Sequence, residues 1–206
     1  MPKIVDKEAK KLEILDAAMK VFAEKGFANT KMLDISGRAH IGKGTIYEYF
    51  SSKDDIFEYV FIHFMKTMEA SVTDALHCSE TPEEKIRCMF MNWANMVVQH
   101  SSDIMEVMLD FWAEAVRKKD ERELGIVNLE KIYTDFRVII QSILEEGIQR
   151  GHFRDQDAYH TASLMLGAMD GIMIQWILDK SHFDLIKVTE HSLDIFLSGI
   201  RMQSEE

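Results

Sequence analysis

A short run of cationic, small and hydroxyl-bearing residues occurs early in the chain, at Lys43, Gly44, Thr45 and Tyr47. Ile46 is the apolar residue within this run. If the run is a helix that buries Ile46, the other four residues are expected on its outer side. A cation, a position without a side chain, a hydroxyl and a phenol suit phosphate groups and base edges, and a helix N-terminus attracts phosphate. The pattern therefore predicts a nucleic-acid contact surface rather than a catalytic centre.

Nucleotide, metal and catalytic motifs are incomplete in this sequence. Gly37-x-x-x-x-Gly42-Lys43 approaches a phosphate-binding P-loop, but glycine follows Lys43 where Ser or Thr would reach magnesium, and no predicted strand precedes the run. Asp157-x-x-His160 is a lone carboxylate–histidine pair, whereas a di-iron bundle needs two Glu-x-x-His pairs. The motifs HExxH and GxSxG do not occur. We therefore expect no metal, no cofactor and no enzymatic activity.

Helices are predicted along the whole chain. Apolar residues recur three and four positions apart in successive segments, and neither strand alternation nor Asn-Gly hairpin signals occur. Gly26 is expected to end the first helix, Thr30 to cap the second, and Ser51 or Ser52 to cap the fourth. The helices are expected at residues 9–25, 30–39 and 43–49, then after residue 52, and near 82–99, 103–119, 123–150, 155–179 and 184–202.

The second and third predicted helices are joined by a turn of three or four residues. This is the arrangement of a helix-turn-helix motif, at about residues 31–50, in which the second helix enters the DNA major groove. Ile35 and Ala39, and then Ile46 and Phe50, are spaced so that both helices pack on the first and the fourth. The sequence thus predicts an all-α protein with an N-terminal three-helix DNA-binding domain.

Charge is distributed unevenly along the chain. The net charge is −11, with 24 Lys and Arg against 35 Asp and Glu. Residues 1–53 hold ten basic and seven acidic side chains, so the remainder holds fourteen basic and twenty-eight acidic ones. A basic N-terminal part can approach a polyanion while the acidic part stays away from it. We therefore predict a DNA-binding domain over residues 1–53 and a second helical domain over residues 54–206.

The cysteine content and the apolar pattern indicate the cellular compartment of the protein. Cys78 and Cys88 are too few for a disulfide framework, and the amino terminus is charged where a signal peptide is apolar. No run of residues has the length and uninterrupted apolar character of a membrane span. These features predict a cytoplasmic protein without a membrane partner.

One pattern extends over much of the first domain: Gly26-Phe27-x-x-Thr30, Asp34-Ile35, Ala39 and Lys43-Gly44-Thr45-Ile46-Tyr47-x-Tyr49-Phe50-x-x-Lys53. It resembles the TetR family of transcriptional regulators. The resemblance implies a homodimer with nine helices in each chain. It also implies a repressor that binds a palindromic DNA operator and releases it when a small molecule binds the second domain. It also implies DNA contacts at Thr30, Lys31, Lys43, Gly44, Thr45, Tyr47, Tyr49 and Lys53.

Four residues depart from the pattern of that family. His40 occupies the turn position usually held by glycine, where a left-handed backbone costs some strain, and Gly42 replaces the usual serine cap. Leu33 stands where many members carry a basic or polar contact. Glu48 either accepts a hydrogen bond from a cytosine amine or points to solvent. The last three favour the alternative of a helical small-molecule carrier or sensor with impaired DNA binding.

Methionine and tryptophan are frequent in the downstream helices, with acidic residues between them. Methionine adapts to ligands of different shape and tryptophan faces attract cations, although the same residues also suit an ordinary core. Through the resemblance we expect an apolar or amphipathic effector, with a lipophilic cation, a fatty acid or acyl thioester, and an aromatic compound all left open. The residues expected to bind it are Met65, Met68, Trp93, Met105, Met108, Phe111, Trp112, Met169 and Trp176.

Small residues recur three and four positions apart near the C-terminus, which permits close approach of helices either within the chain or between chains. The resemblance implies that two helices per chain form a four-helix dimer interface. A dimer is also required mechanically, because two DNA-binding domains must lie about 34–36 Å apart to reach consecutive half-sites. The interface is expected at Gly167, Gly171, Ile174, Leu193 and Leu197.

Overall fold

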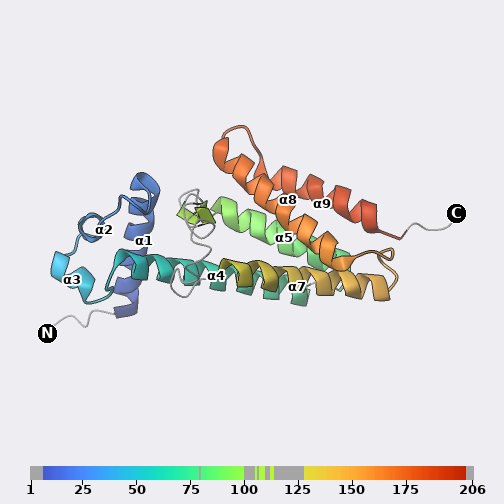
Figure 1. Ribbon diagram of the computed structural model, residues 1–206, viewed down its shortest axis with the longest axis horizontal. Coiled ribbons are helices and arrows are strands. Elements are labelled where there is room, and N and C mark those ends of the chain that lie inside the picture. The colour runs from blue at the N-terminus through green and yellow to red at the C-terminus, as the bar shows by residue number, and fades with distance from the viewer. Residues whose placement is uncertain are drawn as a thin grey trace. The chain divides into compact units, whose positions relative to one another are not determined.

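The computed structural model of the chain describes residues 7–78, 80–99, 105, 107–109, 112–113 and 128–202. These residues form helices, turns and one isolated bridge between Phe153 and Arg201, which confirms the prediction of an all-α protein (Figure 1). The helices are α1 (Lys7–Lys25), α2 (Met32–Arg38), α3 (Lys43–Tyr47), α4 (Lys53–Cys78), α5 (Pro82–Gln99), α7 (Leu129–Gln149), α8 (Ala158–Leu178) and α9 (Leu185–Ile200). The helix expected near 103–119 falls largely outside the described residues.

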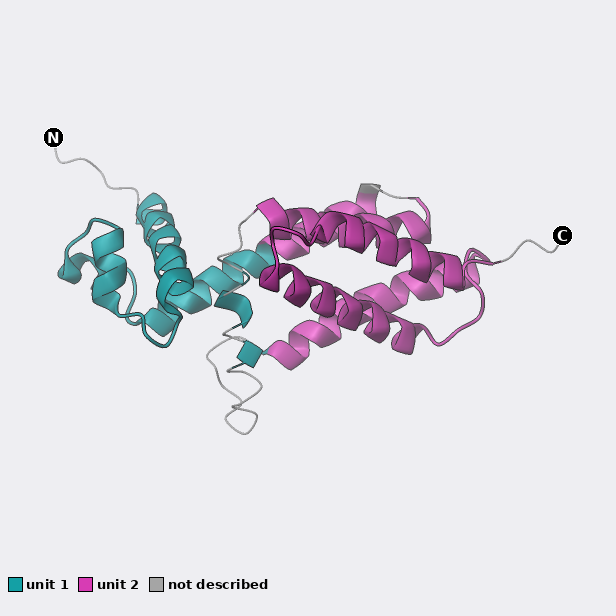
Figure 2. Ribbon diagram, turned by 90° about the horizontal axis from the view of Figure 1, so that it is seen from above, with its two compact units in different colours: residues 1–66, 101–128 teal, residues 67–100, 129–206 magenta. Residues whose placement is uncertain are grey.

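The chain divides into two compact units (Figure 2). The first unit comprises residues 1–66 and 101–128, and the second comprises residues 67–100 and 129–206. The division falls inside α4, whereas the boundary predicted from the sequence falls where α4 begins. The predicted DNA-binding domain therefore lies inside the first unit, and its functional boundary stays a prediction.

Local hydrogen bonds fix the end of α1 and the start of α2. Gly26 is left-handed (φ 75°) and its amide donates to the carbonyl of Phe22 at 2.8 Å, which confirms it as the end of the first helix. The buried Thr30 hydroxyl donates back to the Gly26 carbonyl at 2.9 Å. Lys31 is the residue that precedes α2, and its amide donates to the Asp34 carboxylate at 2.9 Å. The prediction of Thr30 as the cap is therefore wrong by one residue.

The start of α4 is fixed by two hydrogen bonds that involve Asp55. The amide of Asp55 donates to the Ser52 hydroxyl at 3.0 Å, and the amide of Ser51 donates to the Asp55 carboxylate at 2.8 Å. The first bond occupies a backbone donor that a helix N-terminus leaves without a partner, and the second holds the residue before the cap. Of the two caps that the sequence left open, Ser52 is the one used.

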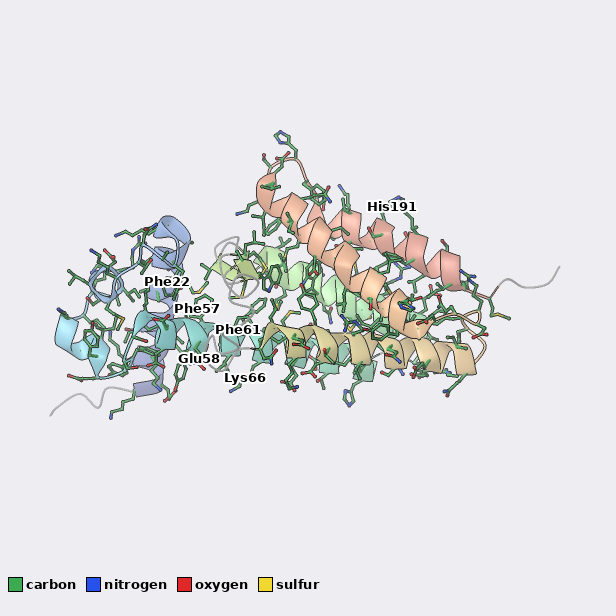
Figure 3. All side chains as sticks on the ribbon, viewed as in Figure 1. Phe22, Phe57, Glu58, Phe61, Lys66 and His191 are labelled. Carbon is green, nitrogen blue, oxygen red and sulfur yellow. The ribbon has the colours of Figure 1, made fainter. Side chains whose placement is uncertain are left out.

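Three phenylalanines tie α1 to α4 within the first unit. The ring of Phe22 on α1 lies 5.3 Å from that of Phe27 in the following turn and 6.1 Å from that of Phe57 on α4, and the last two are 5.0 Å apart (centroid distances). Figure 3 labels Phe22 and Phe57, which point toward each other from the two helices. Tilted and edge-to-face contacts of this kind stabilise beyond the area they bury.

The residues predicted to anchor α2 and α3 do face inward. Ile35, Ile46 and Phe50 are fully buried, and Ala39 is half-buried. Asp34 in α2 also forms an ion pair with Lys25 of α1 at 2.7 Å, and this ammonium holds the pKa of the Asp34 carboxyl below its usual value. Both short helices are thus held by the first unit rather than by their own length.

The second unit is a bundle in which α5 packs on α7 and α9, and α8 packs on the same two helices. Lys85 of α5 forms an ion pair with Glu146 of α7 at 2.6 Å, and Arg87 of α5 forms one with Asp194 of α9 at 2.7 Å. Lys85, together with Arg150, holds the pKa of Glu146 below its usual value. These pairs are partly exposed, so they set the register of the helices more than they add stability.

A close approach in α7 generates the first testable prediction. A Cβ added to Gly147 would overlap the ring of the buried Phe153, whose amide donates to the Gly147 carbonyl at 3.1 Å. Gly147→Ala is expected to lower the free energy of unfolding by about 1–3 kcal/mol, although alanine favours a helix. Chemical denaturation measures this. In the control Gly199→Ala the new Cβ meets nothing within 4 Å, so equal stability of the two variants would contradict the prediction.

Candidate DNA-binding and effector sites

The turn between α2 and α3 is built on a left-handed residue. His40 has φ 52°, the one positive φ at a residue other than glycine in the described part of the chain. The amides of His40 and Ile41 donate to the carbonyls of Gly37 and Ser36 at 3.3 and 3.0 Å. This is the Schellman arrangement, which ends a helix and redirects the chain. The left-handed conformation considered for His40 is therefore present.

α3 is fixed on one side and open on the other. Ile46 and the following Phe50 are buried, whereas Lys43, Gly44 and Tyr47 are exposed, Tyr47 by 48%. A Cβ added to Gly44 would meet no atom within 4 Å, so another surface can approach the backbone closely there. The structure thus gives α3 one unobstructed side that carries a cation, a gap and a phenol.

The other expected DNA contacts are placed less uniformly. Lys31 is exposed, and Thr45 and Tyr49 are half-buried. Gly42 precedes α3 with an extended backbone (φ −66°, ψ 151°) and caps it without a side chain. Thr30 is buried and its hydroxyl is bonded to the Gly26 carbonyl, so its side chain is not available to a phosphate. The DNA contact expected at Thr30 stays a prediction, which its backbone would have to make.

Lys53 has a structural role that the sequence did not indicate. Its ammonium donates to the carbonyls of Phe27 and Ala28 at 2.8 and 3.0 Å and lies 4.6 Å from the centroid of the Phe27 ring. Lys53 is the first residue of α4, so these contacts join the start of α4 to the turn after α1. At most one of its three hydrogens is left for the phosphate contact that the resemblance implies.

Two departures from the family pattern are exposed on the surface of the motif. Leu33, the second residue of α2, is 63% exposed. Glu48 is exposed at the C-cap position of α3, where its carboxylate is available to solvent or to a base edge. Neither side chain covers Lys43 or Tyr47, both of which are exposed as well.

The residues expected to bind an effector fall in both compact units. Those described in the first unit are Met65, Met105, Met108 and Trp112, those in the second are Met68, Trp93, Met169 and Trp176, and Phe111 lies outside the described residues. Five of the eight that are described are buried, and Met65, Trp93 and Trp112 are half-buried. Burial of this degree fits the alternative of ordinary core packing, so contact with an effector stays a proposal.

A half-buried polar pair joins α7 to α8 in the second unit. The phenol of Tyr133 donates to the carboxylate of Asp170 at 2.8 Å. Burial raises the pKa of Asp170, an effect that the hydrogen bond from Tyr133 partly offsets. Burial, and then the neighbouring carboxylate, raise the pKa of Tyr133 above its ordinary value. Sequence spacing gives no sign of this bond, because the two residues are thirty-seven positions apart.

Three buried polar atoms in the described part of the second unit have no hydrogen-bond partner. They are the Nε of Arg137, the Nε2 of Gln156 and the Oγ1 of Thr189. A buried polar atom without a partner costs about 1–3 kcal/mol. Sequence patterning could not identify them because it does not show which polar atoms lose water. Within the described residues, no group of three His, Cys, Asp or Glu is placed to hold a metal ion.

α8 presents an apolar surface on the side away from its neighbours. By length and composition it is the one described helix apolar enough to cross a membrane, and within this unit it packs on α7 and α9. Leu164, Ile174 and Leu178 nevertheless remain exposed, Leu178 by 80%, and glycines 167 and 171 lie between them at helical spacing. These residues form one stripe, which we call the α8 stripe.

The expected interface residues of α9 are not available to a partner. Leu193 and Leu197 are 0% and 1% exposed inside their own chain. Their periodicity signals the face that α9 turns to the bundle, so their assignment to the dimer interface is corrected. Ile195, on the other side of α9, is exposed instead.

Helices α1, α2 and α3, with α3 short and outwardly open, together with a second helical unit are the arrangement of a helix-turn-helix DNA-binding regulator. Residues 14–60 match the family model of bacterial regulatory proteins, tetR family, and residues 82–198 match that of the BetI-type transcriptional repressor, C-terminal. The second match spans more than half of the chain. The chain belongs to the TetR family of transcriptional regulators, as the sequence pattern indicated.

Relatives and solved structures agree with this assignment along nearly the whole chain. The fatty acid metabolism regulator protein of Bacillus subtilis (strain 168) is 24% identical over 195 residues, which cover 94% of this chain and 97% of the relative. The ketosteroid regulator KstR2 of Mycobacterium tuberculosis has a TM-score of 0.75 at 23% identity, with 94% and 95% covered. FadR of Bacillus subtilis in complex with stearoyl-CoA has a TM-score of 0.67 at 25% identity, with 92% and 99% covered. These relatives are regulators rather than enzymes.

The turn residue generates the second testable prediction. A left-handed backbone costs a residue with a Cβ about 1 kcal/mol or more, and glycine avoids this cost. His40→Gly is therefore expected to raise the free energy of unfolding by about 0.5–1 kcal/mol, as measured by chemical denaturation. The matched control is Ala39→Gly, one residue earlier at φ −78°, which is expected to lower it. Destabilisation by both variants would show that the His40 side chain stabilises the turn.

Proposed function

We propose that the chain is a homodimeric repressor that binds a palindromic operator through α2 and α3 and releases it when an effector binds the second unit. The observation that carries the proposal is the open side of α3, on which Lys43, Gly44 and Tyr47 are exposed while Ile46 fixes the opposite side. Lys43 supplies positive charge for phosphate groups, and Tyr47 offers a ring and a hydroxyl to base edges.

The charge distribution supports contact with DNA through the first unit. Residues 1–53 carry a net charge of +3, whereas the chain as a whole carries −11. The acidic remainder repels DNA, so only the basic part can approach the duplex. We place the protein in the cytoplasm, where an operator is accessible.

The α8 stripe supports a dimer. Nothing lies within 4 Å of a Cβ added to Gly167 or Gly171, so a helix of a second copy can approach the backbone of α8 closely. Leu164, Ile174 and Leu178 supply apolar area on either side of this gap. We assign the interface to these five residues together with Ile195 of α9, in place of Leu193 and Leu197.

α4 supports a route from the effector to the DNA. Its residues up to Lys66 belong to the first unit, and those from Thr67 belong to the second. An effector that shifts the second part of α4 therefore acts on a helix that also carries the packing of α1 through Phe57. To weaken operator binding 100-fold, the effector must prefer the released form by about 2.7 kcal/mol.

The effector is proposed to be apolar or amphipathic, with a long-chain acyl thioester as the first candidate. This choice is supported by the relative that regulates fatty acid metabolism and by the similar FadR structure that holds stearoyl-CoA. A lipophilic cation is the second candidate, because its charge would pair with the half-buried carboxylate of Asp170.

The alternative of a carrier or sensor with impaired DNA binding is not favoured. It depended on Leu33, Gly42 and Glu48. Gly42 still caps α3 with ordinary geometry, and the other two leave Lys43 and Tyr47 exposed. Matches to regulators over nearly the full length also favour operator binding.

A gel-shift experiment with DNA flanking the protein's own gene tests the proposal. Purified protein is expected to retain a discrete fragment, with affinity that falls steeply as salt rises. Stearoyl-CoA and tetrabutylammonium are then added separately as effector probes. Retention of no fragment at low salt would overturn operator binding, and release by neither probe would overturn the two candidate effector classes.

Tyr47 provides the third testable prediction. Tyr47→Ala is expected to weaken binding to the retained fragment by about 1–3 kcal/mol and to leave binding to unrelated DNA nearly unchanged, as measured by fluorescence anisotropy. Tyr159→Ala, which removes a phenol of almost equal exposure (49%) from α8, is the matched control and should keep wild-type affinity. Equal affinities of the two variants would remove Tyr47 from the interface.

The α8 stripe provides the fourth testable prediction. Gly171→Leu is expected to yield monomers in sedimentation, because the new side chain fills the gap that a partner helix needs. The variant should still fold, since the added Cβ meets nothing within 4 Å in its own chain. Gly37→Leu makes the same substitution at an equally open glycine of α2 and should remain dimeric. A dimeric Gly171→Leu protein would place the interface elsewhere.

A further inference from the structure

Leu33 is an exposed apolar side chain on α2, one of the two helices that the proposed function places against DNA. It is 63% exposed, whereas the other branched aliphatic residues of α2 and α3, Ile35 and Ile46, are fully buried. An exposed leucine by itself is ordinary. Its place on the helix-turn-helix motif calls for an explanation. Apart from the ring of Tyr47, every other exposed residue of α2 and α3 has a polar side chain or is glycine.

The contacts of α2 fix the direction in which Leu33 points. Asp34 and Arg38, one turn apart, form ion pairs with Lys25 and Glu24 of α1. Ile35 points into the core. At about 100° per residue, Leu33 lies about 160° around the helix from Ile35. Leu33 therefore points away from the core, on the open side of α2.

The surface beside Leu33 is shaped for close approach. Gly37 lies one turn further along the same side of α2, and a Cβ added to it would meet nothing within 4 Å. Gly44 leaves a similar gap on the open side of α3. Leu33 is thus a single apolar projection beside backbone that another surface can reach, in a part of the chain with a net positive charge.

We propose that Leu33 recognises a thymine by its C5-methyl group at one position of each operator half-site. The proposal rests on the proposed operator binding. Apolar contact with this methyl group is the way in which an aliphatic side chain distinguishes a base in the major groove. Leucine neutralises no phosphate, so Leu33 adds sequence preference without adding to the salt dependence of binding.

Replacement of thymine by uracil tests this directly, because uracil lacks only the methyl group. Each thymine of the fragment retained by the wild-type protein is replaced in turn by uracil, and affinity is measured by fluorescence anisotropy. At one thymine per half-site, the replacement is expected to lower the protein's affinity about 4-fold, which is the effect of losing one buried methyl group. Leu33→Ala is expected to weaken binding to the thymine fragment and to bind the thymine and uracil fragments equally at that position.

A matched variant separates this contact from a general loss of leucine. Leu12 on α1 is 54% exposed, so Leu12→Ala removes the same atoms from another exposed site of the first unit. It should keep both the wild-type affinity and the full sensitivity to uracil. A second variant, Leu33→Lys, should lose the sensitivity to uracil while the slope of log affinity against log salt steepens by about one unit per DNA-binding unit.

The outcomes distinguish this proposal from the proposed function. If the wild-type protein retains no DNA fragment, operator binding fails and the role of Leu33 fails with it. If the wild-type protein binds, but no thymine is sensitive to uracil or Leu33→Ala keeps the sensitivity, only the role of Leu33 is overturned. Loss of the sensitivity in Leu33→Ala alone, with Leu12→Ala unchanged, supports it.

Discussion

The burial of Ile46 and Phe50 in the first unit is the interaction on which the recognition surface depends. α3 has five residues, far fewer than an isolated helix needs in order to be stable in water. Its helical form and its orientation must therefore come from packing and from the turns at its ends. The Schellman turn at His40 sets where α2 stops, and the capped start of α4 holds the chain after Phe50. The side chains on the open side of α3 are therefore positioned by the packing of Ile46 and Phe50 on the opposite side.

Residues that hold this surface and residues that are free to contact DNA are largely different. Thr30 and Lys53 both matched the pattern of DNA contacts, yet the hydroxyl of the first and the ammonium of the second are bonded to carbonyls of the turn after α1. Hydrogen bonds from a charged donor are stronger than those from a neutral one, so the Lys53 ammonium holds this turn firmly. The pattern in the sequence thus combines two requirements, to build the turn and to approach DNA, and only the structure separates them.

Local signals in the sequence predicted these helix ends well because each end is fixed by bonds between residues that are close in the chain. Gly26 and the serine cap of α4 appear where expected, since a left-handed glycine and a hydroxyl cap act on neighbouring atoms. What depends on distant partners was not predictable. A stripe containing Leu193 shows that α9 has an apolar side, but not whether its own chain or a second copy covers it. The bond from Tyr133 to Asp170 joins two helices whose register no single sequence reveals.

The two units differ in how completely their polar groups are satisfied, and this difference bears on how a signal passes through the protein. All three buried polar atoms without a partner in the described residues belong to the second unit. A ligand shifts an equilibrium only by its different affinity for two states, and unsatisfied groups are where such a difference is readily gained. In the described part of the first unit, no buried side-chain nitrogen or oxygen is without a hydrogen-bond partner. In the proposed mechanism, the unit that would bind the effector is therefore also the one with buried side-chain polar groups left to satisfy.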